Sequence, residues 1–425
     1  MKINVSDNHA NSNSRLVLYA FIITVFFQIT MYRFIWGIEL ISRVLNIFTI
    51  VIFSSYSVHI FNKNRFNKNV LIYYIWPGFF VFIGLFINTT ICSISNLSLI
   101  NQYGRLIPWA MYLSIPNLLT SKKINVSELW RYFNNFMFVS VLISITEYYL
   151  LLLGVIVPRE IITPGGSFLA GFFSMLWADE RGEIYYRFYS SFAEPGTLAM
   201  FLLPVMAYSF LHKKYFYLAV YLVAMFLTES LGGFIGCAML IPLLVYFKYK
   251  KNWIYSVTMS LFSVLLLIIL LGNEFNERYQ VKNYSALERE ENAIGVVTSL
   301  PSLFFKYPLG LPLVENTALA MQNPDYHGAT FTPGNIFNNG GVLSFIGYIS
   351  VLFVSLRYAI SSLFRKVHSL DEQVAIVSIF CLIPFIYQRM VVWDTSVFAL
   401  LFAPFVINYL HRVSTTASIG GVSSP

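Results

Sequence analysis

The sequence predicts an all-α protein, a single polytopic bundle of about twelve transmembrane helices. Two features of the composition support this class: hydrophobic residues make up 57% of the 425 residues, and charged residues only 11%. In soluble domains, charged residues alone make up about a quarter. The third observation is a series of apolar runs of about 20 residues, the length that crosses a bilayer. We therefore expect the bilayer to be the main solvent of this chain.

The apolar runs place the expected helices in order along the chain. They lie near residues 15–32, 37–57, 70–91, 105–119, 133–156, 196–211, 215–229, 231–247, 253–272, 338–356, 373–389 and 396–411. Residues 1–14 are polar and precede the first run without a small-residue cleavage site, so we expect an uncleaved first helix. The whole chain, 1–425, is expected to form one integral membrane domain.

Lysine and arginine residues gather in alternate connections between these helices. The clusters are Lys63, Arg65 and Lys68; Lys122, Lys123 and Arg131; Lys213 and Lys214; Lys248, Lys250 and Lys251; Arg357, Arg365 and Lys366. With twelve helices, every cluster falls on one side, which the positive-inside rule identifies as the cytoplasm. We expect a multi-pass inner-membrane protein with both termini in the cytoplasm. The net charge of +8 then reflects topology, and no nucleic-acid partner is expected.

Two periplasmic connections, 157–195 and 273–337, are much longer than the others. Long loops beside a membrane domain usually carry function. In the second loop, Ser285 and Glu288 have the spacing of a helix capping box. Apolar residues follow at near-helical spacing: Ala286, Ala293, Val297 and Leu300. We expect an amphipathic helix there, lying at the membrane surface.

The first loop ends in RFYSSFAEPGTLAMF, residues 187–201, where Arg187 and Glu194 directly precede the helix expected at 196–211. Pro195 fits the first turn of that helix. Both charges would lie at the outer boundary of the membrane. One interpretation is structural: Arg187 reaches lipid headgroups and Glu194 favours the helix N-terminus. The other is that both residues act on a substrate.

The second loop carries the histidine that the expected topology places outside, His327, and two arginines, Arg278 and Arg289, that flank the start of the predicted surface helix. Arginine side chains bind phosphate oxygens bidentately. The alternatives are a solvated histidine and a solvated face of ion pairs with neighbouring glutamates. No Asp-x-Asp pair occurs in the sequence, so we expect chemistry that needs no metal ion and no cofactor.

Four further charged residues lie within or beside the apolar runs. Glu39 and Arg43 are four residues apart in the second run and are expected to form an ion pair on one helix face. Glu147 and Glu229 lie toward the outer leaflet, where either would suit a polar cleft.

The motif RxxSxFxEPxxxA is filled by Arg187, Ser190, Phe192, Glu194, Pro195 and Ala199. It resembles the O-antigen polymerase (Wzy) family. Further matches are LTESLGG at 227–233, the region from Arg289 to the PLG at 308–310, and His327 followed by Asn335 and GGVLSFIGY. The resemblance covers the chain from Arg187 onward, while the earlier part matches in hydropathy alone. Related O-antigen ligases often carry an arginine where Leu231 follows Ser230, which favours a polymerase.

The resemblance implies a C-type glycosyltransferase-like bundle that polymerises a surface polysaccharide, as in lipopolysaccharide biosynthesis. Its substrates would be undecaprenyl-pyrophosphate-linked oligosaccharide repeat units, joined at the periplasmic face. Membrane lipids and a chain-length regulator protein are the other partners implied. The nearest alternative is an O-antigen ligase, which transfers glycan to the lipid A core. A lipid-linked oligosaccharide flippase is disfavoured, because it would carry charges inside the bundle and need no large charged loop.

Joining two such units requires an acceptor hydroxyl to attack an anomeric carbon while a lipid pyrophosphate leaves. We expect Arg187 and Arg289 to stabilise the leaving group. Glu194 and His327 are the candidate bases for the hydroxyl, and the sequence leaves both open. Substrate-binding contacts are expected from Arg278, Asn335, Ser190 and Glu229.

Overall fold

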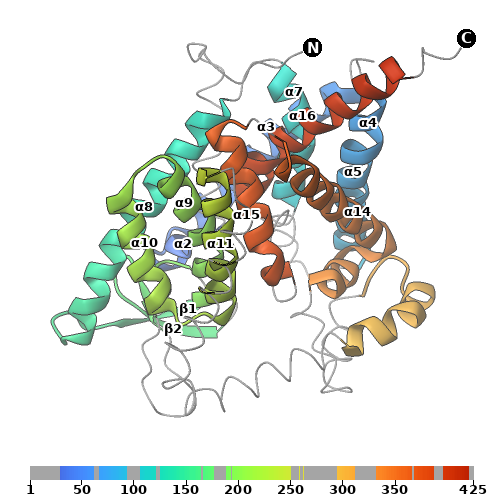
Figure 1. Cartoon of the computed structure of the whole chain (residues 1–425). Helices are drawn as coiled ribbons and strands as arrows, with labels where there is room; N and C mark the ends of the chain where they lie inside the picture. The colour runs from blue at the N-terminus through green and yellow to red at the C-terminus, as the bar shows by residue number, and fades with distance from the viewer. Residues whose placement is uncertain are drawn as a thin grey trace, which may run out of the picture.

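The computed structural model describes residues 29–61, 67–92, 106–120, 125–163, 166–176, 188–192, 194–249, 258, 262, 294–311, 332–365, 368–386 and 396–420. These residues are mostly helical, which agrees with the all-α part of the predicted fold class (Figure 1). The first expected span is described only from residue 29, and the span expected near 253–272 only at two isolated positions.

Helices occupy the positions of all the other expected spans. They are α2 (Tyr32–Ile35), α3 (Glu39–Phe61), α4 (Lys68–Val70), the π-helix η2 (Leu71–Ile75), α5 (Trp76–Cys92), α7 (Ile107–Thr120), α8 (Val126–Leu152), α9 (Pro195–Leu211), α10 (Tyr215–Thr228), α11 (Leu231–Tyr249), α14 (Thr332–Leu363), α15 (Leu370–Ile386) and α16 (Ser396–Gly420). By length and composition, 4 helical stretches within the described ranges suit a membrane crossing: Lys68–Ile91, Val126–Leu152, Leu231–Lys248 and Thr332–Leu363. The count of twelve remains a prediction.

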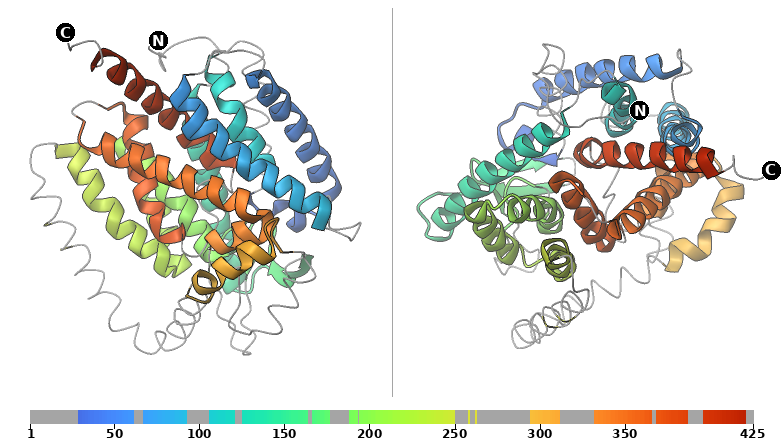
Figure 2. Two further views of the ribbon diagram at one scale, coloured as in Figure 1. Left: turned by 90° about the vertical axis from the view of Figure 1, so that its right-hand side faces the viewer. Right: turned by 45° about the horizontal axis from the view of Figure 1, so that its top comes forward.

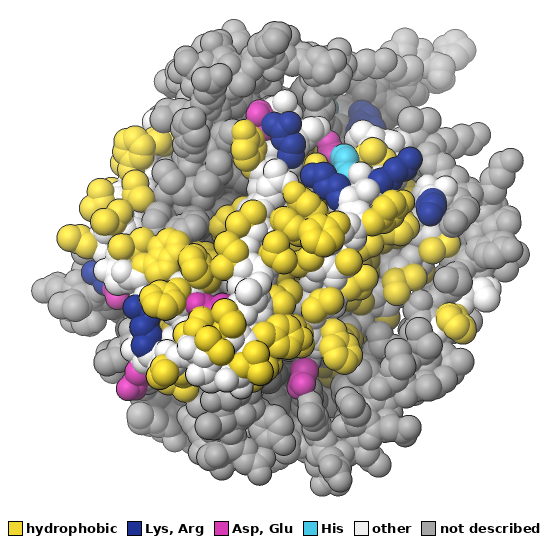
Figure 3. All heavy atoms as spheres, turned by 90° about the vertical axis from the view of Figure 1, so that its left-hand side faces the viewer, with side chains coloured by type: hydrophobic (Ala, Val, Ile, Leu, Met, Phe, Trp, Pro, Cys, Tyr) yellow, Lys and Arg dark blue, Asp and Glu magenta, His cyan; other side chains and the backbone are white. Residues whose placement is uncertain are grey.

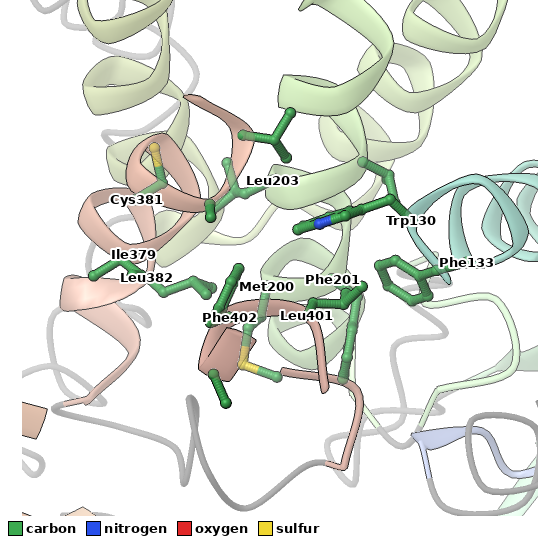
Figure 4. Packing of buried hydrophobic residues seen from close by; sticks show 14 of the residues in the cluster. Trp130, Phe133, Met200, Phe201, Leu203, Ile379, Cys381, Leu382, Leu401 and Phe402 are labelled. Carbon is green, nitrogen blue, oxygen red and sulfur yellow. The ribbon is translucent and has the colours of Figure 1, made fainter. Parts of the chain in front are cut away.

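The core lies where α8, α9, α15 and α16 meet. Figure 4 shows Trp130 of α8 between α9 and α16, and its ring lies 6.0 Å from Tyr208 and 6.1 Å from Phe402. Phe133, one turn further along α8, contacts Phe201 of α9 at 6.4 Å between ring centroids. Nearly all of α9 is buried, so this helix occupies the interior of the bundle.

The outer surface is apolar over the middle of the molecule. Figure 3 shows a broad band of apolar side chains on the face that looks left in Figure 1, with most charged side chains above and below it. Exposed residues of α8 and α10 contribute, among them Val139, Ile143, Leu222 and Phe226. An apolar surface of this extent is unusual in a soluble monomer and suits contact with lipid.

Charged residues from separate loops meet at one end of the bundle. Beyond α9, His212 lies 3.3 Å from Asp371 at the start of α15. The neighbouring Glu372 forms ion pairs with Arg365, which follows α14, and with Arg412 of α16 at 3.6 Å. The sequence places the connections after α9, α14 and α16 on one side of the membrane, and here the residues from these connections are in contact.

A small sheet lies near the opposite end, in the loop 157–195, where no strands were predicted. Its strands β1 (Arg159–Thr163), β2 (Gly166–Ala170) and β3 (Met175–Leu176) are antiparallel in the order β1-β2-β3. In the register, Arg159 pairs with Ala170. In the sequence, Pro164 and Gly165 stand between β1 and β2, and this Pro-Gly pair is a turn signal that could have indicated the hairpin.

The helix Ile294–Lys306 occupies part of the segment expected to be amphipathic in the second loop. The capping-box residues Ser285 and Glu288 lie outside the described ranges. Val296 and Leu303 on its inner face pack against Phe337 of α14. The helix is therefore attached to the beginning of α14.

The PLG segment at 308–310 fits into a break in α14. The backbone of Gly341 leaves the helical conformation, with φ 66° and ψ −163°, a region that only glycine adopts readily. The Val342 N–H donates to the Pro308 carbonyl at 2.9 Å, and the Leu311 N–H donates to the Asn338 carbonyl at 2.9 Å. These bonds satisfy backbone groups that the break releases.

We expect Gly341→Ala to lower the melting temperature far more than Gly154→Ala. Both glycines have positive φ, 66° and 71°, so each alanine loses about 1–2 kcal/mol in the backbone. A Cβ at Gly154 meets nothing within 4 Å, whereas a Cβ at Gly341 would overlap the carbonyl oxygen of Pro308. Thermal unfolding of both variants in detergent measures the difference, and equal shifts would contradict the packing of the PLG segment against α14.

Candidate functional site

One face of α8 carries three buried polar residues, Ser140, Ser144 and Glu147. Their spacing of four and three residues places them on the same side of the helix. Each of the three makes a hydrogen bond to a segment outside α8: α2, the turn between β2 and β3, or residues 188–192. This polar face of α8 therefore holds the outer part of the molecule.

Both carboxylate oxygens of Glu147 accept hydrogen bonds from the turn between β2 and β3. One carboxylate oxygen accepts from the Phe172 N–H at 2.6 Å, and the other accepts from the Phe173 and Ser174 N–H groups at 2.8 and 2.7 Å and from the Ser174 hydroxyl at 2.7 Å. Successive N–H groups arranged in this way form an anion-binding nest. A Cβ on Gly171 would lie 2.5 Å from the Glu147 carboxyl carbon, so the approach requires glycine. Glu147 thus anchors a loop, whereas the sequence suggested that it might line a cleft.

Ser190, predicted to contact substrate, is fully buried beneath this surface. Its hydroxyl donates to the Ser144 hydroxyl at 2.7 Å, and its carbonyl accepts from the Met175 N–H at 2.7 Å. Its φ of 51° is in the left-handed region, which is uncommon for a residue other than glycine. In this position Ser190 shapes the backbone of the segment and presents no exposed group. Next to it, the Ser191 carbonyl accepts from the Met31 N–H at 2.6 Å.

Segments 187–201 and 227–233 are in contact. The Phe188 N–H donates to the Leu227 carbonyl at 3.3 Å. In the first turn of α11, a Cβ on Gly233 would lie 2.8 Å from the Ala199 Cβ, so α9 and α11 approach closely there.

Glu229 ends α10 at this contact. Its φ of 48° is again left-handed, and the residue is partly exposed. The Glu229 N–H donates to the Phe226 carbonyl at 3.2 Å, and a left-handed backbone at a residue other than glycine is found at functional sites more often than elsewhere. The position leaves Glu229 at the surface beside segment 187–201.

Glu194 is exposed at the N-terminus of α9. Its extended backbone precedes Pro195, which occupies the first turn of the helix, as predicted. The Glu194 carbonyl accepts from Thr197 and Leu198, each at 3.1 Å, while its side chain does not cap the helix. The positive end of the helix dipole favours the ionised carboxylate at this position.

Asn335 lies in the first turn of α14 and is partly exposed. Its carbonyl accepts from the Asn339 side chain at 2.7 Å. In the neighbouring PLG segment, the Leu309 carbonyl accepts from Asn88 of α5 at 2.9 Å. Asn335 thus lies in the part of α14 that leads to the break and that the PLG segment contacts.

Four candidate residues, Arg187, Arg278, Arg289 and His327, lie outside the described ranges, and their roles remain predictions. The structure adds Trp36 and Arg159, which the sequence analysis did not single out. The Trp36 indole donates to the Phe172 carbonyl at 2.8 Å, and Arg159 donates to the Ile35 carbonyl. The aromatic run YRFIW at 32–36 was the available signal, because such clusters are typical of membrane interfaces.

No protein-family model, curated protein or solved structure matches this chain. The resemblance to O-antigen polymerases therefore rests on the motif residues alone and remains a prediction.

We expect Glu147→Gln to raise the rate of amide hydrogen exchange in residues 171–175 at least tenfold. A hydrogen bond to a charged group contributes about 1.5–3 kcal/mol, and the variant replaces one acceptor oxygen by a donor that faces N–H groups. Glu128→Gln is the matched control in the same helix, because Glu128 is partly exposed and its ion pair with Arg131 spans 3.5 Å. Unchanged exchange in Glu147→Gln would refute the anchoring role.

Proposed function

We propose that this protein is a glycosyltransferase that polymerises undecaprenyl-pyrophosphate-linked oligosaccharide units at the periplasmic face of the inner membrane. In this proposal the chain forms a bundle of about twelve helices with both termini in the cytoplasm. A chain-length regulator is the protein partner. The product is O-antigen or a similar surface polysaccharide.

The observation that carries the proposal is the pairing of the motif segments in space. Segment 187–201 contacts segment 227–233, and the PLG segment at 308–310 contacts the GG pair at 340–341. Each pair is separated by about 30 residues of chain, and each supplies residues that the resemblance marks as functional. Exposed Glu194 is positioned directly by the first contact, because it follows the buried residues 188–192.

In the proposed reaction, an acceptor sugar hydroxyl attacks the anomeric carbon of the donor unit. The new glycosidic C–O bond forms as the bond between the anomeric carbon and the phosphate oxygen breaks. Glu194 accepts the hydroxyl proton, with His327 as the alternative base. Arg187 and Arg289 stabilise the departing pyrophosphate, because charge develops on its oxygens in the transition state. Glu229 and Asn335 contact the sugars, and Ser190 positions the segment that precedes Glu194.

Purified protein in detergent, supplied with its lipid-linked repeat unit, should give a ladder of longer glycans that persists in EDTA. The expectation follows from the use of arginine in place of a metal ion to stabilise pyrophosphate. Gel electrophoresis of the products measures chain length. Transfer of glycan to a lipid A core without any ladder would identify a ligase and refute the polymerase.

We expect Glu194→Gln to lower the polymerisation rate by about 10²–10⁴-fold, because general-base catalysis contributes a factor of that size. Glu160→Gln is the matched control, since Glu160 is an exposed glutamate of the same loop. Both variants require equal expression and equal thermal stability. A Glu194→Gln variant that elongates glycans at the normal rate would leave His327 as the remaining candidate base.

A further inference from the structure

Arg33 of α2 has a partly buried side chain, and no ion pair joins it to another residue in the part of the chain that the structure describes. Its Nε is buried and makes no hydrogen bond within the described ranges, and its guanidinium lies 4.6 Å from the centre of the Phe34 ring. Burial lowers the pKa of Arg33, Glu39 counters this effect, and the positive charge of Arg43 adds to it. Removing a cation even partly from water is costly, so an anion is the group that would stabilise Arg33 here.

Arg43 supplies a second guanidinium group, near the start of α3. It lies 3.4 Å from Glu39, and the side chains of both are about half exposed, 41% and 42%. The ion pair predicted from the sequence is thus present, but it lies in the first turn of α3, because Glu39 begins the helix. The Ile38 N–H donates to the Arg33 carbonyl at 2.9 Å, so α3 begins directly beside Arg33, and the charge of Glu39 acts on both arginines.

This pair of arginines lies close to the candidate site. The Met31 N–H donates to the Ser191 carbonyl at 2.6 Å, so α2 is bonded directly to the segment that leads into Glu194. Trp36 stacks on Tyr32 with 4.7 Å between ring centroids and is 40% exposed. Tryptophan beside arginine is typical of the depth at which lipid phosphates lie.

The outward face of α3 has the polarity expected of a surface in contact with lipid. Its inward residues Ser42, Asn46 and Thr49 are polar and at most 9% exposed. Its outward residues are large, apolar and more than half exposed: Leu40, Ile41, Val44, Ile47, Phe48 and Val51. Figure 2 shows α3 at the periphery of the bundle in both views. A hydrocarbon chain can lie along this face, starting from the end that carries Arg43.

We propose that Arg33 and Arg43 bind the pyrophosphate of a polyprenyl-pyrophosphate-linked molecule, whose hydrocarbon tail lies along the outward face of α3. Two guanidinium groups match two phosphate groups, and each can bind oxygens bidentately. The assignment rests on the proposed function for the identity of the ligand. It adds a binding site in the N-terminal part of the chain, which the motif resemblance does not reach.

The test is binding of undecaprenyl pyrophosphate to the purified full-length protein in detergent, measured by native mass spectrometry. Because Arg187 and Arg289 are proposed to hold pyrophosphate at a separate site, the bound molecules are counted, and Arg33→Gln and Arg43→Gln should each weaken the binding of one molecule at least tenfold. Arg357→Gln, which removes an exposed arginine of α14, should bind like the unaltered protein. Wild-type affinity in both Arg33→Gln and Arg43→Gln would overturn the site. If Arg33→Gln does not fold, half-exposed Arg43 still provides the test.

Two other probes separate the sources of phosphate. Phosphatidylglycerol that binds as tightly as undecaprenyl pyrophosphate, with the same losses in both variants, would identify a general headgroup site and overturn the assignment. Inorganic pyrophosphate that binds equally tightly would overturn the role of α3 in holding the tail. Polymerisation is measured separately. If the ligand binds but no glycan ladder forms, the proposed polymerase is refuted and this site is not. If a ladder forms but binding does not depend on Arg33 or Arg43, this site is refuted and the polymerase is not.

Discussion

The outer part of this protein depends on the hydrogen bonds that Glu147 accepts from three consecutive residues, 172–174. The carboxylate is buried, and burying it without hydrogen-bond partners would be costly, so the N–H groups of the turn stabilise it. The turn that carries these donors is also bonded to Ser144, and β3 is bonded to Ser190. Through these contacts, one carboxylate on α8 determines where the small sheet lies and supports the segment that ends at Glu194.

The same requirement to satisfy backbone groups explains the second long loop. Where α14 breaks at Gly341, the carbonyl and N–H groups released from the helix are taken up by residues 308–311. In a region close to lipid, an irregular segment persists only where protein groups complete its hydrogen bonds. Both outer loops are therefore attached to the bundle by backbone hydrogen bonds, and each attachment brings together two segments that the motif resemblance singled out.

Helix positions were predictable because long apolar runs need no partner to identify them, and the helices lie where those runs predicted. The sheet was missed because β1 to β3 are short and their burial depends on contacts with α8 and α2. The roles of Ser190 and Glu147 were also beyond the sequence. Whether a hydroxyl or a carboxylate meets a substrate or a backbone N–H depends on residues 25 or more positions away. Glu194 was placed correctly at the start of its helix because proline marks that position.

Charged side chains are paired differently at the two ends of the bundle, and this difference bears on where an anionic ligand would bind. At the end that carries Asp371 and Glu372, carboxylates are matched by His212, Arg365 and Arg412 in closed ion pairs. Such pairs hold helices together and leave little charge for a ligand. At the opposite end, the half-exposed ion pair of Glu39 and Arg43 lies near partly buried Arg33 and exposed aromatic residues. Since an anion stabilises a partly buried cation, this end of the bundle suits the proposed phosphate site.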